Sequence, residues 1–295
     1  MTPHSPNLHL FQSGAMARLW PLLGASAQGL YLDGCLGVAK GVAYSGLLAF
    51  FPAIASIAAV LVQARAESVS RTIARLLYDV VPPGTEDVVR NLFVVQGQRP
   101  QWLLFLAIGS AAWAASGAMM SLMEGFRAVY RIPEGRGFVR DRLIAILLVV
   151  TSALPVLGAS AMIVFGKRVE QTIVHWIGIS GQSADLTGWV LLVGQASRFA
   201  IAFTAIVLAS SFTYYLGPNR KQTFRQVIPG AILATVLWLL ATLGFSWYVS
   251  HVARYDNNVL YRGVGAGLAL LVWIYLLGVI VLFGCEFNWV RERGA

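Results

Sequence analysis

Long apolar runs separated by short polar segments make up most of the chain. Six runs have the roughly 20 apolar residues that a helix needs to cross about 30 Å of hydrocarbon, and we expect spans at 38–62, 102–124, 143–165, 189–215, 227–249 and 264–287. Every backbone N–H and C=O in hydrocarbon needs a partner within the protein, so runs of this length form helices. The pattern therefore predicts an all-α, polytopic membrane protein with six transmembrane helices.

The segments outside these runs have other patterns. Residues 1–14 are rich in Pro, Ser and His, which favours a disordered tail. Residues 15–37 are too interrupted by Pro and Gly to span, and an interfacial amphipathic helix is expected there. Apolar residues at helical spacing in 65–96 predict an external amphipathic helical segment within a transmembrane domain of 38–290.

The composition agrees with a membrane protein. Hydrophobic residues make up 57% of the chain, charged residues only 12%, and the mean hydropathy is +0.68. The net charge of +9 is compatible with nucleic-acid binding, but cytoplasmic loops of membrane proteins also collect Lys and Arg because these residues set orientation. The loops at 127–142 and 216–226 hold eight basic residues against four in the opposite short loops, which predicts that both termini lie in the cytoplasm.

Arg198 is the most unusual residue of the predicted spans. It lies nine residues into the span 189–215, or about 13 Å from Trp189 at 1.5 Å per residue. Placing an arginine near the centre of a helix in the bilayer costs about 2.5 to 3.5 kcal/mol, so such residues usually face a partner or a wet cavity. Gln195 precedes it on the same helical face. This pair could bind an anionic or phosphate headgroup, or Arg198 could bond to carbonyls that a kink has freed.

Two glutamates and two prolines have alternative interpretations. Glu124 and Glu286 lie at the inner ends of their spans with arginines following, Arg127 after the first. They could be salt-bridged anchors, or carboxylates that couple proton movement if burial disfavours their charge. Pro52 and Pro155 predict kinks in the first and third spans; these kinks could border a cavity or only improve packing.

Four further arginines follow the second span, namely Arg131, Arg136, Arg140 and Arg142. A basic juxtamembrane cluster can hold anionic lipid headgroups, and the orientation rule also explains it. The expected partners are therefore anionic membrane lipids, with a second copy of the chain as a further candidate and no nucleic acid.

No catalytic group, cofactor or metal site is expected. The two cysteines and four histidines do not have the paired spacing of a zinc site. Nuclease chemistry needs carboxylates or histidines grouped around metal ions, whereas the 13 acidic residues are scattered. No nucleophile with an ordered base and no phosphate-binding glycine loop is visible.

Several long segments, in this order, resemble one known family. They are KGVAYSGLLAFFPAIASIAAVL, GFRAVYRIPEGRGFVRDRL, YYLGPNRKQTFRQVIPGAILATVLW, FSWYVSHVARYDNN and WIYLLGVIVLFGCEFN. With Pro52, Pro229, Gly230, Glu286 and Asn288 among the matching residues, the chain resembles the YihY/BrkB family, historically mislabelled ribonuclease BN.

The resemblance implies a multi-pass fold in the bacterial inner membrane without a settled activity. It also implies links to the envelope, including serum resistance and movement of a lipopolysaccharide precursor. The leading hypothesis is a transporter or flippase-like protein for an anionic, amphiphilic envelope substrate. A non-transporting scaffold for envelope assembly is the alternative, and ribonuclease activity is disfavoured.

Overall fold

The structure is a computed structural model that describes residues 15–63, 101–133, 135–176, 184–252 and 259–294. The helices are α1 (Ala15–Leu32), α2 (Cys35–Gln63), α5 (Gln101–Val129), α6 (Phe138–Trp176), α7 (Ala184–Leu216), α8 (Phe224–Val252) and α9 (Val259–Arg293). Within these ranges there is no strand, so the all-α prediction is confirmed. The predicted tail 1–14 and the external segment 65–96 lie outside the described residues.

Five helices have the length and composition of membrane spans. They are α2, α5, α7, α8 and α9, with candidate spans of 23 to 28 residues. Large apolar side chains project from them, including Phe105, Leu243 and Leu268, as expected for helices that face lipid. The predicted span 143–165 lies within α6, but the side chains of the second half of α6 are outside the described set. The polytopic membrane class is confirmed, while the count of six spans remains a prediction.

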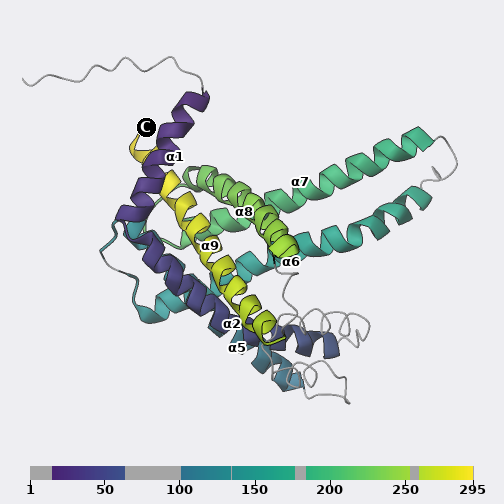
Figure 1. The fold of residues 1–295 in the computed structure, drawn as a ribbon, viewed down its shortest axis with the longest axis horizontal. Coiled ribbons are helices and arrows are strands. Elements are labelled where there is room, and N and C mark those ends of the chain that lie inside the picture. Colours follow the sequence, from purple (N-terminus) through teal and green to yellow (C-terminus); the bar gives the residue numbers. More distant parts are fainter. Residues whose placement is uncertain (1–14, 64–100, 134, 177–183, 253–258, 295) are drawn as a thin grey trace, which may run out of the picture.

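The helices form a bundle from which one pair extends. Helix α2 packs against α5 and α9, α8 packs between α7 and α9, and α1 packs against α9. Helices α6 and α7 run side by side and extend away from the other helices toward their far ends (Figure 1). The most buried side chains include Phe126, Tyr214 and Leu282. They lie near the C-terminal ends of α5, α7 and α9. The core therefore lies where the α6–α7 pair joins the bundle.

Helices α8 and α9 cross with their backbones in contact. A Cβ atom at Gly230 would lie 2.1 Å from the carbonyl oxygen of Gly284, so only glycine fits there. Pro229 has no N–H and its ring displaces the carbonyl one turn earlier. The side chain of Asn288 on α9 lies against this turn: its Oδ1 accepts from Gly230 N at 2.7 Å and its Nδ2 donates to Val227 O at 3.1 Å.

Helices α2 and α5 meet through small residues near Pro52. The Ser56 hydroxyl lies 2.9 Å from Pro52 O in its own helix and 2.6 Å from Ala107 O on α5. Close approach through small side chains with interhelical hydrogen bonds is the usual mode of helix packing in lipid. Pro155 lies inside α6, and the kinks expected at both prolines remain predictions.

Turns and caps define the helix ends on the side of the bundle where the α6–α7 pair joins it, which we call the joined end. Gly34, with φ of 69°, turns the chain between α1 and α2, and Arg131 ends α5 in the same left-handed region with φ of 53°. Helix α8 begins with one half of a capping box, because Thr223 N donates to the Gln226 side chain Oε1 at 2.8 Å, while Gln226 N donates to the backbone oxygen of Thr223 at 3.0 Å. These turns bring four charged chain segments together.

Candidate functional site

The four segments form what we call the charged end layer. It consists of the α1–α2 turn at 33–34, the α5–α6 loop at 130–137, the α7–α8 loop at 217–223 and the end of α9 at 286–293. Arg131 in the second segment lies 3.7 Å from Asp33 in the first, and Arg220 in the third pairs with Glu292 in the fourth. Segments that are far apart in the sequence thus lie in one layer, and the orientation rule predicts that it faces the cytoplasm.

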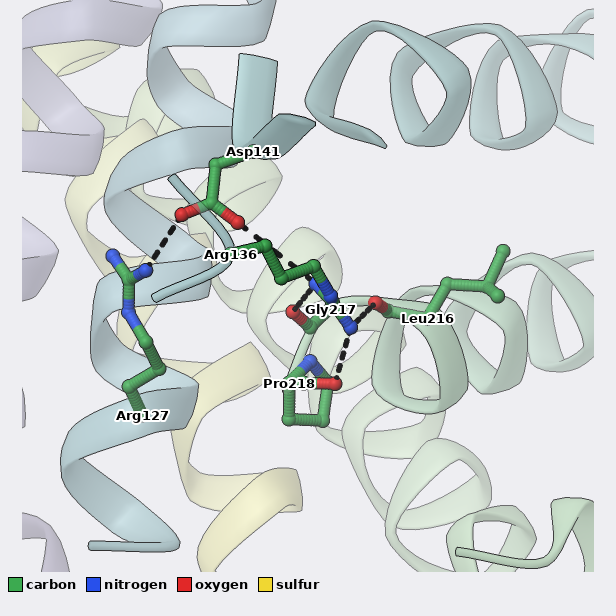
Figure 2. A network of polar contacts seen from close by, with 6 residues as sticks. All are labelled: Arg127, Arg136, Asp141, Leu216, Gly217 and Pro218. Carbon is green, nitrogen blue, oxygen red and sulfur yellow. Dashed lines mark hydrogen bonds and ion pairs between the residues drawn. The ribbon is translucent and has the colours of Figure 1, made fainter. Parts of the chain in front are cut away.

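Arg136 caps the end of α7. Its guanidinium donates to the carbonyl oxygens of Leu216 at 3.0 Å, Gly217 at 3.1 Å and Pro218 at 2.7 Å (Figure 2). The last carbonyls of a helix lack partners within the helix and carry partial negative charge, so a cation here satisfies both needs. Burial lowers the pKa of Arg136, while the nearby Asp141 opposes that change. The guanidinium of Arg136 therefore binds main-chain carbonyls of the protein, and the lipid contact predicted for it remains a prediction.

Asp141 connects Arg136 to α5. Its Oδ2 lies 2.8 Å from Arg127 Nη1 and its Oδ1 lies 4.0 Å from Arg136 Nη1 (Figure 2). The position in the first turn of α6 is one that stabilises a carboxylate. A Cβ atom at Gly135 would come within 2.3 Å of Arg127 Nη1, so a larger residue here would have to displace this ion pair. Ion pairs and hydrogen bonds thus tie α5, α6 and α7 together at this end.

Arg220 lies over two aromatic rings. Its guanidinium carbon is 4.5 Å from the ring centroid of Tyr130 and 5.4 Å from that of Trp289, and the two rings meet edge to face. Burial raises the pKa of the Tyr130 hydroxyl above its usual range, so this ring stays neutral under the cation. Cation–π contacts of this kind contribute about 0.5 to 2 kcal/mol, more when desolvated.

Glu286, in the α9 segment of the charged end layer, is buried with 1% of its surface exposed. A Cβ atom at Gly29 would lie 2.8 Å from its Oε2, which shows that the carboxyl group packs directly on the backbone of α1. Its Oε1 is buried without a hydrogen-bond partner. By contrast, Glu124, which the sequence paired with it, is exposed on α5, and the ion-pair partner of Arg127 is Asp141.

Arg142 takes a different direction from its neighbours in the sequence. Its Nη2 donates to Trp113 O at 3.1 Å, its Nη1 lies 3.1 Å from Met120 Sδ, and its guanidinium carbon is 4.0 Å from the Trp113 ring centroid. Trp113 is inside the candidate span Trp102–Val129 of α5. Arg142 was expected at the lipid headgroups, and the structure places its guanidinium against the middle of a spanning helix. Arg140 and Arg131 are exposed.

Arg198 lies on the packed face of α7. It is partly buried and shares this face with Ala202 and Ala209, both 4% exposed. Gln195 is exposed, so the structure does not bring it onto that face. The hydroxyls of Thr213 and Ser152 lie 3.3 Å apart, and because α6 and α7 are antiparallel this contact fixes their register. Arg198 is at the level of about residue 167 of α6, far from the charged end layer.

The predicted site residues therefore fall into separate places. The charged end layer holds Arg131, Arg136 and Glu286, and Arg127 on α5 contacts it through Asp141, whereas Arg142 and Arg198 lie on the α6–α7 pair. The sequence reasoning missed Asp33, Asp141 and Asn288. Only Asp141 had a signal in the sequence: it lies in the first turn of a helix, five residues after Arg136 in a short loop, where a carboxylate can bridge two arginines. Among the described residues no three His, Cys, Asp or Glu side chains gather as metal ligands, and the absence of a metal remains a prediction.

Long apolar helices, lipid-facing side chains and a charged layer at one end define a polytopic α-helical membrane protein. The family model described as Virulence factor BrkB matches residues 27–295, and the chain belongs to this family. The predicted family membership is thus confirmed.

Known relatives are similar over much of the chain. A protein of Bacillus subtilis named ribonuclease-like protein YfkH is 32% identical over 186 residues, which are 63% of this chain and 64% of the relative. A UPF0761 membrane protein of Pseudoalteromonas translucida is 27% identical over 84% of this chain and 78% of its own length. One of Alkalilimnicola ehrlichii is 26% identical over 87% of this chain and 55% of its own length. The match thus spans less than two thirds of the first and third relatives. No solved structure matches this chain.

Proposed function

We propose that this protein is a transporter or flippase-like protein of the bacterial inner membrane, with both termini in the cytoplasm, for an anionic amphiphilic envelope substrate. The observation that carries the proposal is the α6–α7 pair. It joins the bundle at one end, extends from it toward the other (Figure 1), and carries an arginine toward each end.

The joined end supplies an anchor for movement. Arg136, Asp141 and Arg127 hold the start of α6 and the end of α7 to α5 (Figure 2). In a hinge motion a few loop or element-terminal residues absorb the change in backbone angles while the rigid elements on either side swing. The α6–α7 pair has this form, so its far ends are the parts expected to move against α8 and α9.

The two arginines supply attraction for an anionic headgroup. Arg142 is near the start of α6, and the register places Arg198 at the level of residue 167, about 37 Å farther along the pair at 1.5 Å per residue. This separation is comparable to the thickness of a bilayer. A substrate with a negative headgroup and an apolar tail could thus meet one cation beside the middle of α5, at Arg142, and another farther along the pair, at Arg198, while its tail stays in lipid.

The test is a lipid-translocation assay with the full chain in liposomes. A fluorescent anionic phospholipid placed in both leaflets is quenched from outside, and the fraction quenched reports exchange between leaflets. We expect exchange by the unaltered chain, and at least a tenfold slower rate for Arg142→Gln and for Arg198→Gln. Lys221→Gln, at an exposed loop position, is the matched control. If neither arginine variant slows exchange in folded protein, the proposed roles are wrong.

The scaffold alternative predicts a different outcome. No exchange by the unaltered chain for anionic or zwitterionic lipids would favour a scaffold that holds envelope proteins together.

The name of the Bacillus subtilis relative describes that protein as ribonuclease-like, and we do not extend this activity to the present chain. An RNA-cleavage assay of the same preparations, with and without Mg²⁺, tests whether the protein is a ribonuclease. Metal-dependent cleavage would show that it is.

A further inference from the structure

The carboxyl group of Glu286 has an unusual environment for an acidic side chain. It is 1% exposed, one oxygen packs against the backbone of Gly29 at a distance that leaves no room for a Cβ atom, and the other oxygen is buried without a hydrogen-bond partner. None of the ion pairs within the described residues includes Glu286. An ionised carboxylate in such a place carries a large desolvation cost that nothing offsets.

A second carboxyl group makes the imbalance larger. Asp33, in the α1–α2 turn, donates its backbone N–H to Gly29 O at 2.8 Å, so it lies one helical turn beyond the glycine on which Glu286 packs, and its side chain is 15% exposed. Two ionised carboxylates this near each other repel, and they can share a hydrogen bond only when one of them carries a proton. The pair needs a positive charge that is shared between them.

The charged and titratable groups around the pair do not supply that charge. Arg131 from the α5–α6 loop is 63% exposed and lies 3.7 Å from Asp33, so it balances Asp33. Arg293, on the same helix as Glu286, stacks at 4.2 Å on the Trp289 ring. Cys35, at the start of α2, is a buried free cysteine and brings no positive charge. One negative charge therefore remains uncompensated among these groups.

We propose that Glu286 and Asp33 form a binding site for one small cation, a proton or a monovalent metal ion, between α9 and the α1–α2 turn. Glu286 is the buried ligand, through Oε1, and Asp33 is the ligand on the side of the charged end layer. The cation balances the pair and holds α1 against α9. Loss of the cation leaves two adjacent carboxylates that push the α1–α2 turn away from α9. The site is separate from the proposed lipid path on α6 and α7, and it stands whether or not the protein moves lipid.

Infrared spectroscopy of the full chain in nanodiscs tests the proton form directly. A protonated buried carboxyl group gives a C=O band that is separate from those of ionised carboxylates. For a bound proton we expect this band at neutral pH in the unaltered chain, its loss as the pH is raised, and its absence in Glu286→Gln. Glu124→Gln removes an exposed carboxyl group of α5 and should keep the band.

Thermal unfolding in different salts tests the metal-ion form. Above its dissociation constant, each tenfold increase of a bound ion raises the folding equilibrium constant about tenfold, so the melting temperature should rise with NaCl or KCl but not with choline chloride. Glu286→Gln should remove this dependence, and Glu124→Gln should keep it.

The infrared band and the salt response of the unaltered chain test the cation site even if Glu286→Gln does not fold. Asp33→Asn, at a turn position, then takes its place as the second variant and should also alter the band or the salt response. The proposal is overturned if the unaltered chain shows neither a protonated carboxyl band at neutral pH nor a response to sodium or potassium. It is also overturned if both signals persist unchanged in Glu286→Gln and Asp33→Asn.

Discussion

Replacing Asn288 by alanine should weaken the crossing of α8 and α9 more than any other single amide removal in the described residues. The side chain is 5% exposed and serves two backbone groups of α8, Gly230 N at 2.7 Å and Val227 O at 3.1 Å. Alanine removes both hydrogen bonds and leaves Asn-sized space next to the crossing.

The magnitude follows from what the two backbone groups lose. A buried polar group left without a partner costs about 1 to 3 kcal/mol, whereas interhelical hydrogen bonds in membrane proteins average about 0.6 kcal/mol because the separated helices find other partners. Here Pro229 has already disturbed the turn, so the two backbone groups have no ready helical replacement for the amide. We therefore expect a loss of about 2 to 3 kcal/mol, or a factor of about 30 to 150 in the folding equilibrium.

The assay is equilibrium unfolding by SDS in mixed micelles, followed by tryptophan fluorescence and by far-ultraviolet circular dichroism. Asn219→Ala, at an exposed position of the α7–α8 loop, is the matched control and should change stability by less than about 0.5 kcal/mol. An Asn288→Ala protein that unfolds within that margin of the unaltered chain would refute the reasoning that the amide replaces backbone bonds at Pro229.

Three further outcomes are expected in the same unfolding assay. Gly230→Ala should destabilise by about 3 kcal/mol or more, since its Cβ would lie 2.1 Å from Gly284 O and overpacking against backbone cannot relax easily; a neutral effect would contradict the close crossing. Arg136→Gln should cost about 2 to 4 kcal/mol, because three carbonyls lose a charged donor, and should speed proteolysis in the α7–α8 loop; unchanged cleavage would argue against the cap. Arg142→Lys should cost about 1 to 2 kcal/mol through its contacts with Trp113, and a lysine that stabilises equally well would show that the planar group is unimportant.

The hydropathy pattern was sufficient to predict the helices but not their full lengths. Predicted span 143–165 lies within α6, which runs from Phe138 to Trp176. Hydropathy reports the part of a helix that lies in hydrocarbon, whereas a helix continues while its backbone bonds and caps permit. The polar ends of α6, with Asp141 at the start, therefore could not be assigned from apolar residues alone.

The site was harder to predict because its side chains are selected by tertiary contacts. Glu124 and Glu286 have the same setting in the sequence, a carboxylate at the end of an apolar run with an arginine soon after, yet one is exposed and the other is buried on Gly29. Arg140 and Arg142 are two residues apart, and only Arg142 faces α5. Helical periodicity predicts that such neighbours point in different directions, but it does not tell which direction is toward the bundle.

The polar contacts at the joined end have a physical reason that apolar patterns do not reveal. Lipid chains are as apolar as leucine side chains, so burial alone gives helices in a bilayer little cause to choose one neighbour over another. Specific pairing must then come from close backbone contact and from polar groups that lack other partners. In this chain those contacts, the glycine crossing of α8 with α9 and the Arg136 cap on α7, lie toward the same end. These two contacts hold α7, α8 and α9 at that end, and the proposed lipid movement requires that the far ends of α6 and α7 move relative to α8 and α9.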